Sequence, residues 1–300
     1  MVNVKQLAKK EEFITGGTFA CTGCQAIYGL RLVQMALGKN TVIINASGCM
    51  TLTVTHPFTC YKTPWLFNAI ENAASTATGV AKGFEAQGKK VNVVCYAGDG
   101  STSEIGLGAV SGAAYRNDNI IYICYNNGNY ANTGHQVSAE TPVYARTKTS
   151  PIGKKNKFGN LLPRKNLAKL MALNGAVYSA TASTSHPFDF MQKLEKASKI
   201  KGFKFIDLLT PCEPGWLVKT NEMFKVGKMM VDSGLWPVYE IENKKVTVNI
   251  KPTMTSVKDV FKMQGRYKHL SASMMKDVQK KIKLEWDLIN SGKFWESEEY

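Results

Sequence analysis

The chain has 300 residues, 44% of them hydrophobic and 20% charged, which is enough to bury a full core in one large domain or two modest ones. No run reaches the roughly 18 apolar residues of a membrane helix, and the N-terminus, MVNVKQLAKKEEF, lacks the apolar centre of a secretory signal. These features exclude a membrane protein and predict a cytoplasmic one. The net charge of +15 is compatible with nucleic-acid binding, but the lysines are scattered, without a recognised nucleic-acid-binding pattern, and are densest at 148–165.

The first chemical pattern along the chain is Cys21-x-x-Cys24, which leads into an amphipathic segment, 26–37, typical of a helix. This spacing alone is compatible with zinc, a redox disulfide or chance. A thioredoxin-like site requires a strand before the first cysteine, whereas the segment before Cys21 is interrupted by glycines. A metal cluster requires further thiolates.

Two later cysteines provide them. Cys49 follows the predicted strand 41–46, in NASGCM, and Cys212 follows the predicted strand 203–209, in TPCEPGW. All four cysteines therefore lie in turns marked by glycine or proline, next to strand ends or a helix start. Four such thiolates hold either zinc, as a structural site, or a [4Fe–4S] cluster, which adds one-electron chemistry.

The central stretch of the chain, 91–136, predicts two buried parallel strands, 93–97 and 119–125, joined through a helix at 105–115. A polar turn follows each strand: Gly98-Asp99-Gly100 and then 126–129. Because a right-handed crossover places both turns at the same carboxyl edge of the sheet, we expect a ligand site there.

The residue types in these turns point to a divalent cation and a phosphate. Gly98 and Gly100 allow the backbone to approach a ligand closely, and the following helix directs free N–H groups at an anion. The Asp99 carboxylate beside a phosphate requires a hard cation such as Mg²⁺ between them. Asn127 offers a side-chain carbonyl and Asn129 a main-chain carbonyl. The alternative is an ordinary strand-to-helix turn.

The remaining segments are interpreted as scaffold. We expect a long helix at 64–86, a strand at 174–183, a helix at 187–199 and a C-terminal helical stripe that includes Val278 and Ile282. Cys95 and Cys124 lie inside the central strands and are expected to be buried, and Cys60 is unassigned. The sequence predicts an α/β protein with a doubly wound, mostly parallel sheet at 1–240 and a C-terminal helical extension at 241–300.

The central stretch resembles the thiamine diphosphate motif: the Gly98-Asp99-Gly100 turn is followed by 25 residues and then by the double asparagine Asn126-Asn127. The resemblance extends over essentially the whole chain to the thiamine-diphosphate-binding β subunit of the 2-oxoacid:ferredoxin oxidoreductases. The stretches that carry it include CTGC, ASGCM, GDGSTSEIGLGAVSGA, YICYNNGNYANTGHQ, LLTPCEPGW and LWPVYEIE.

The resemblance implies a thiamine-diphosphate-type fold, a set of cofactors and their ligands. Asp99, Asn127 and Asn129 are the implied Mg²⁺ ligands that hold the diphosphate, and Cys21, Cys24, Cys49 and Cys212 are the implied ligands of a [4Fe–4S] cluster. The cofactor-binding residues are expected to be Ser47, Cys49, Gly98, Asp99, Gly100, Ser101, Asn127 and Asn129. The loop that contains Asn132 and His135 is expected near the thiazolium and substrate, as the catalytic loop.

The implied activity is oxidative decarboxylation of a 2-oxoacid, pyruvate above all, with coenzyme A as acyl acceptor and ferredoxin as electron acceptor. The implied partners are the α subunit and γ- and δ-type subunits, and another subunit supplies the glutamate that activates the aminopyrimidine; no nucleic acid or membrane is expected. Ser101, Asn126, His135 and Val137 depart from the usual family pattern, which leaves the 2-oxoacid open to branched-chain, aryl or other types. The alternatives are a non-oxidative thiamine enzyme with structural zinc and a basic nucleic-acid-binding protein.

Overall fold

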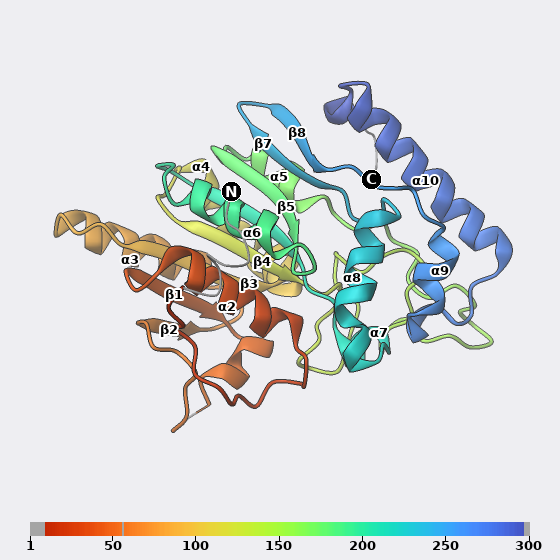
Figure 1. Cartoon of the computed structure of the whole chain (residues 1–300), viewed down its shortest axis with the longest axis horizontal. Helices are drawn as coiled ribbons and strands as arrows, with labels where there is room; N and C mark the ends of the chain where they lie inside the picture. Colours follow the sequence, from red (N-terminus) through yellow and green to blue (C-terminus); the bar gives the residue numbers. More distant parts are fainter. Residues whose placement is uncertain (1–9, 56, 297–300) are drawn as a thin grey trace.

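The computed structural model of the chain describes residues 10–55 and 57–296. They form an eight-stranded mixed sheet in the order β2-β1-β3-β4-β6-β5-β7-β8 (Figure 1). The strands from β2 to β5 in this order are all parallel, and β7 and β8 are antiparallel additions at one edge. The bounds are β1 Thr41–Ala46, β2 Trp65–Asn68, β3 Asn92–Gly98, β4 Ile121–Asn126, β5 Tyr178–Ser183, β6 Lys204–Leu209, β7 Val238–Glu242 and β8 Lys245–Ile250.

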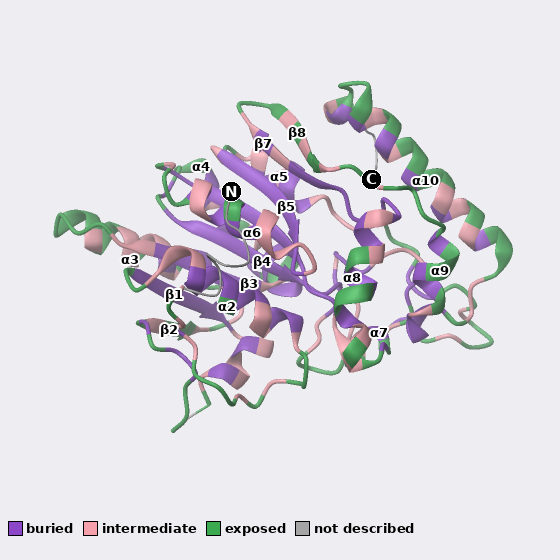
Figure 2. Cartoon of the chain, viewed as in Figure 1, coloured by how far each residue is buried: buried purple, intermediate pink, exposed green. Residues whose placement is uncertain are grey.

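Helices cover both faces of the sheet. Helices α2 and α6 pack on one face with Ile43, Tyr96 and Ile206, while α3, α4 and α5 pack on the other with Ile44, Cys95 and their neighbours. Alternate residues of the same strands thus point to opposite cores, and Figure 2 shows the central strands as buried. The predicted doubly wound α/β class is confirmed. The helices are α2 Gln25–Leu37, α3 Ala73–Ala86, α4 Leu107–Tyr115, α5 Leu167–Leu173, α6 Pro187–Ala197, α7 Glu213–Trp216, α8 Met223–Asp232, α9 Val257–Lys262 and α10 Ala272–Asn290.

The predicted helix at 64–86 is wrong in its first part. Residues Trp65–Asn68 form the parallel edge strand β2 against β1, and α3 begins only at Ala73. The backbone of Pro64 starts this pairing, since its carbonyl accepts the amide of Ile43 at 3.0 Å. Aromatic and apolar residues such as those of WLFN favour a strand when a neighbouring strand is available.

The C-terminal part of the sheet was also not predicted. Strands β7 and β8 form an antiparallel hairpin, with Asn243 and Lys244 in the left-handed region at φ 48° and 62°. Such a two-residue turn matches the twist of the flanking strands. The expected boundary at residue 240 falls inside β7.

Helices α9 and α10 pack against this hairpin. The predicted stripe on α10 is buried at Val278, Ile282, Trp286 and Ile289, in one cluster with β7 residues such as Tyr239. The C-terminal segment therefore shares a core with the sheet. Among the described residues, no helix is both long and apolar enough to cross a membrane. The first nine residues, on which the predicted absence of a signal peptide depends, lie outside the described part.

A buried lysine at the start of β6 gives a test of this core. The Lys204 side chain is 3% exposed, its amino group donates to Asn119 Oδ1 at 2.8 Å, and burial lowers its pKa to about 8. The unfolded chain binds the proton more tightly, so unfolding should become harder as the pH rises from about 8 to 10.5, by up to roughly 3 kcal/mol. Thermal unfolding of Lys204→Met should show a weaker rise over this window, and an unchanged rise would contradict the assignment.

Candidate active site

A cavity of about 230 Å³ lies at the carboxyl ends of β1, β3 and β4. The chain runs from β1 outward to β2 on one side and from β3 to β4 on the other, and this change of direction is where open α/β sheets bind ligands. The cavity is lined by all eight residues predicted to bind cofactor and by Asn132: Ser47, Cys49, Gly98, Asp99, Gly100, Ser101, Asn127, Asn129 and Asn132.

Asp99 follows directly after β3, and its side chain is buried. Its Oδ1 accepts the backbone N–H of Asn127 at 3.3 Å, and its Oδ2 accepts the Ser138 hydroxyl. Burial raises the pKa of the carboxyl to about 7, although both hydrogen bonds oppose the shift. No cationic side chain of the described residues forms an ion pair with it. A divalent cation in the cavity would compensate this buried carboxylate.

The turn after β4 is held by its own side chains. Asn127 Oδ1 accepts the backbone N–H of Asn129 at 3.2 Å, and Asn129 Nδ2 donates to the Asn127 carbonyl at 2.8 Å. The indole of Trp216 donates to the same carbonyl at 2.7 Å. Gly128, at φ 70°, allows the reversal. Both predicted asparagine ligands thus line the cavity from a fixed backbone, beside Asp99.

The glycine turn differs from the expected one, because the helix begins immediately after β3. Residues Ser101–Ile105 form a π-helical turn before α4, and Gly100 has an ordinary helical φ of −63°. Glycine is needed at 100 for space: a Cβ there would lie 2.2 Å from the Tyr130 ring, whose hydroxyl donates to the Gly100 carbonyl at 3.2 Å. The Ser101 hydroxyl donates to the Ile70 carbonyl rather than into the cavity.

Gly100→Ala is expected to displace the Tyr130 ring, which lines the cavity, and to weaken thiamine diphosphate binding by about tenfold or more, as overpacking costs about 1–3 kcal/mol. Calorimetric titration of the Mg²⁺-loaded protein measures this. Gly108→Ala is the matched control, since no atom lies within 4 Å of a Cβ at this position of α4. If the two variants bind thiamine diphosphate with equal affinity, the position of the Tyr130 ring does not affect cofactor binding.

The two predicted catalytic residues lie differently. Asn132 lines the cavity, whereas His135 does not. The backbone of His135 is in the left-handed region, at φ 65°. Its half-buried ring has Nδ1 3.1 Å from Asn129 Oδ1, and burial lowers the pKa of the imidazole. His135 is therefore placed to orient the Asn129 side chain.

The four predicted cluster cysteines lie near one another. Cys49 lines the cavity; burial raises the pKa of its thiol first, and the nearby Cys212, Cys24 and Cys21 raise it further. Burial raises the pKa of Cys212 to about 12, with smaller contributions of the same sign from Cys24 and Cys21. No group of three or more His, Cys, Asp or Glu side chains in the described ranges is arranged to hold a single metal ion. Cys60, Cys95 and Cys124 are buried.

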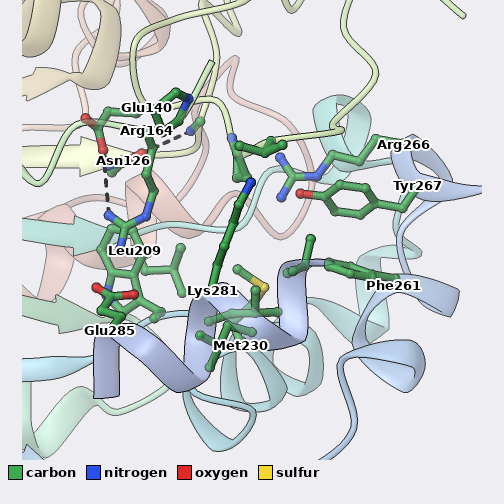
Figure 3. Close-up of a pocket in the computed structure, with 18 of the residues that line it drawn as sticks. Asn126, Glu140, Arg164, Leu209, Met230, Phe261, Arg266, Tyr267, Lys281 and Glu285 are labelled. Atoms are coloured by element: carbon green, nitrogen blue, oxygen red, sulfur yellow. Dashed lines mark hydrogen bonds and ion pairs between the residues drawn. The ribbon is translucent and has the colours of Figure 1, made fainter. Parts of the chain in front are cut away.

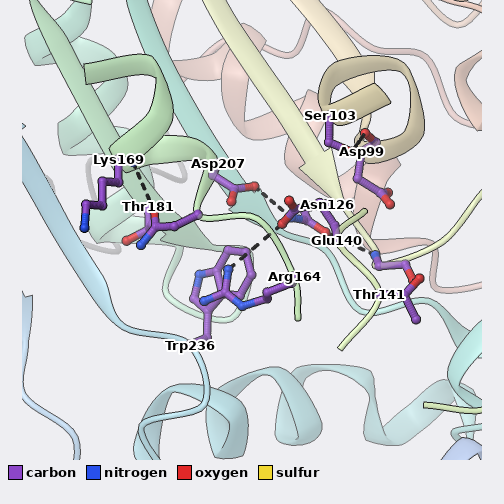
Figure 4. A network of polar contacts seen from close by, with 12 residues as sticks. Asp99, Ser103, Asn126, Glu140, Thr141, Arg164, Lys169, Thr181, Asp207 and Trp236 are labelled. Atoms are coloured by element: carbon purple, nitrogen blue, oxygen red, sulfur yellow. Dashed lines mark hydrogen bonds and ion pairs between the residues drawn. The ribbon is translucent and has the colours of Figure 1, made fainter. Parts of the chain in front are cut away.

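A buried polar network supports the turn from behind (Figure 4). Asn126 Nδ2 donates to Asp207 on β6 at 3.0 Å and to Glu140 at 2.8 Å, and an Arg164 nitrogen lies 4.0 Å from Glu140. The network connects the residues after β4 to the middle of the sheet. Asparagine at 126, a departure from the family pattern, can donate to both carboxyl groups, which an aspartate cannot.

Three residues of the site were not assigned from the sequence. Tyr130 packs on Gly100, Ser138 donates to Asp99, and Trp216 donates to the Asn127 carbonyl. All three occur in stretches that carry the resemblance, but their partners lie far away in the chain, so no local spacing indicates the contacts.

The chain matches known proteins over most of its length. Residues 46–208 match the family model described as thiamine pyrophosphate enzyme, C-terminal TPP binding domain. The chain is 43% identical to pyruvate synthase subunit PorB of Methanothermobacter marburgensis, over 91% of this chain and 96% of that protein. It is 34% identical to ketoisovalerate oxidoreductase subunit VorB of Pyrococcus furiosus, over 93% of each.

A solved structure has the same fold. It is a 2-oxoglutarate:ferredoxin oxidoreductase from Magnetococcus marinus with 2-oxoglutarate, coenzyme A and succinyl-CoA bound, with a TM-score of 0.60 and 18% identity, covering 83% of this chain and 88% of that one.

Proposed function

The chain belongs to the thiamine-diphosphate-binding subunits of the 2-oxoacid:ferredoxin oxidoreductases, and we propose that it provides the cofactor site for oxidative decarboxylation of pyruvate with coenzyme A. The observation that carries this proposal is a single cavity lined by Asp99, Asn127, Asn129 and Cys49. Pyruvate is favoured because the relative of 43% identity is a pyruvate synthase subunit.

Within this proposal, Asp99, the Asn127 side chain and the Asn129 main-chain carbonyl hold Mg²⁺, which binds the diphosphate. Oxygen ligands of this kind suit Mg²⁺, and the buried Asp99 carboxylate supplies the negative charge. Ser138 and the amide of Asn127 keep the carboxylate oriented. Asn132 lines the cavity and would contact the substrate there, and His135 orients the Asn129 side chain.

Cys21, Cys24, Cys49 and Cys212 are proposed to hold a [4Fe–4S] cluster beside the thiamine site. Cys49 lines the cofactor cavity, and Cys21, Cys24 and Cys212 lie close enough to raise the pKa of its thiol, which suits a group that takes electrons from that cavity. When bound, thiamine diphosphate supplies an acceptor for the electron pair released by decarboxylation, and the cluster supplies one-electron transfer.

The chain acts in a hetero-oligomer in this proposal, because its relatives are named as subunits. The partner subunits would supply the glutamate for the aminopyrimidine and the further clusters that pass electrons to ferredoxin. The three remaining cysteines of this chain are buried within the fold and serve no second cluster.

The test is turnover of the assembled complex with coenzyme A, a viologen acceptor and a panel of 2-oxoacids. Pyruvate should give the highest kcat/KM, by about tenfold or more over 2-oxoisovalerate and 2-oxoglutarate, as one or more extra methylenes in a fitted pocket cost that much. A higher kcat/KM for either of the larger substrates would overturn the proposal that pyruvate is the substrate, but it would not change the assignment of the chain to its family.

A further inference from the structure

A second and larger cavity, of about 440 Å³, lies behind the turn that follows β4 (Figure 3). From the last residue of β4 into this turn, alternate residues line the two cavities: Asn127 and Asn129 line the cofactor site, whereas Asn126 and Gly128 line the second one. The two cavities share no lining residue. None of the proposed cofactor ligands lines the second cavity.

Most of the wall of this cavity is apolar. It comes from the end of β6, from α8 and from the C-terminal helices α9 and α10, which pack together over this space. The apolar lining includes Leu209, Met230, Leu235, Phe261, Val278 and Ile282. A ligand here would need a hydrocarbon body.

One buried cation in the wall has a guanidinium nitrogen without a hydrogen-bond partner. Arg266 is 2% exposed, its Nε donates to Gln264 at 2.9 Å, and its guanidinium stacks on the Trp216 ring at 3.9 Å. Its Nη2 has no hydrogen-bond partner, and no carboxylate of the described residues pairs with it. A buried, unpaired guanidinium is costly unless an anion is supplied.

A second cation is placed near the first. Lys281 on α10 lines the same cavity, and Figure 3 shows its side chain extending toward the part of the cavity that Arg266 faces. The Lys281 amino group also pairs with Asp277, one helical turn earlier, at 3.0 Å. The other charged groups of the lining, Glu140, Arg164 and Glu285, lie at the opposite end in this view, and burial raises the pKa of Glu140, which favours its neutral form.

We propose that this cavity is a binding site for an amphipathic carboxylate, with the carboxylate paired to Arg266 and Lys281 and the hydrocarbon chain on the apolar wall. A carboxylate fits the planar fork of an arginine and would accept a hydrogen bond from the unpartnered Nη2. Because Arg266 stacks on Trp216, which donates to the Asn127 carbonyl, the ligand would lie directly behind the turn of the cofactor site.

The test is calorimetric titration of the purified assembled complex with octanoate and, in parallel, with the neutral octanamide. Octanoate should bind at one site per chain and at least about tenfold more tightly than octanamide, because a charge-assisted bond to a buried partner is lost with the amide. Arg266→Gln should abolish this preference. Arg31→Gln, which removes an arginine exposed on α2, is the matched control and should bind octanoate unchanged.

Several outcomes would overturn the proposal. These are equal binding of octanoate and octanamide, full octanoate affinity in Arg266→Gln, or the absence of binding to the assembled complex. If Arg266→Gln does not fold, Lys281→Glu decides, since Lys281 is half exposed; it should weaken octanoate about tenfold and leave octanamide unchanged. If inorganic phosphate displaces octanoate at equal concentration, the cavity is a simple anion site, and the proposal of an amphipathic ligand is wrong.

Discussion

Asp99→Asn is expected to lower the affinity for thiamine diphosphate in the presence of Mg²⁺ by about 100-fold or more. The substitution keeps the shape of the side chain but removes the one carboxylate placed at this cavity beside Asn127. An amide oxygen is a weaker ligand for a hard divalent cation, and without the cation the diphosphate faces no compensating charge. Equilibrium dialysis with and without Mg²⁺ measures the effect.

The matched control is Asp118→Asn, since Asp118 is also buried but pairs with Arg116 on the outer end of α4, away from the cavity. This variant should bind thiamine diphosphate as the unmodified protein does. The iron content of Asp99→Asn should also remain, because the cluster ligands are separate. Undiminished Mg²⁺-dependent binding in Asp99→Asn would contradict the ligand assignment.

Cys212→Ser is expected to lose most of the bound iron and acid-labile sulfide and the electron paramagnetic resonance signal of the reduced cluster. Burial raises the pKa of the Cys212 thiol to about 12, so a free thiol stays protonated, and only metal ligation makes a thiolate favourable there. A serine hydroxyl is a poor ligand for iron. Thiamine diphosphate binding should be largely retained, because Cys212 does not line the cofactor cavity.

Cys60→Ser is the control for this experiment. Cys60 is buried near Tyr61 and belongs to the hydrophobic cluster beneath α2. Its replacement should leave iron content and spectrum unchanged. If the Cys212→Ser variant keeps its cluster, or the Cys60→Ser variant loses it, the assignment of the four cluster ligands is wrong.

The parallel strands and the cofactor turns could be predicted because their signals are local. Apolar runs such as 93–97 are buried on both faces, and the polar residues that end them come together at one edge of the sheet. This places Asp99 and Asn127 in one cavity with Ser47 and Cys49, as expected. The spacing alone does not separate a zinc site from a cluster.

The features that were missed depend on contacts between distant segments. Trp65–Asn68 form a strand because β1 is available as a neighbour, and the helical pattern that follows obscured this. Tyr130 on Gly100 and Trp216 on the Asn127 carbonyl arise only in the folded chain. Arg266 was not singled out from the sequence, and the packing of the C-terminal segment buries it.

The measurement that tests the central claim most directly is anaerobic addition of pyruvate and coenzyme A to the purified complex, with the visible absorption followed over time. The account predicts iron and sulfide in equal amounts, stoichiometric thiamine diphosphate and bleaching of the cluster absorption by pyruvate, which Asp99→Asn prevents. Bound zinc in place of iron, or a cluster that pyruvate does not reduce although thiamine diphosphate is bound, would contradict it.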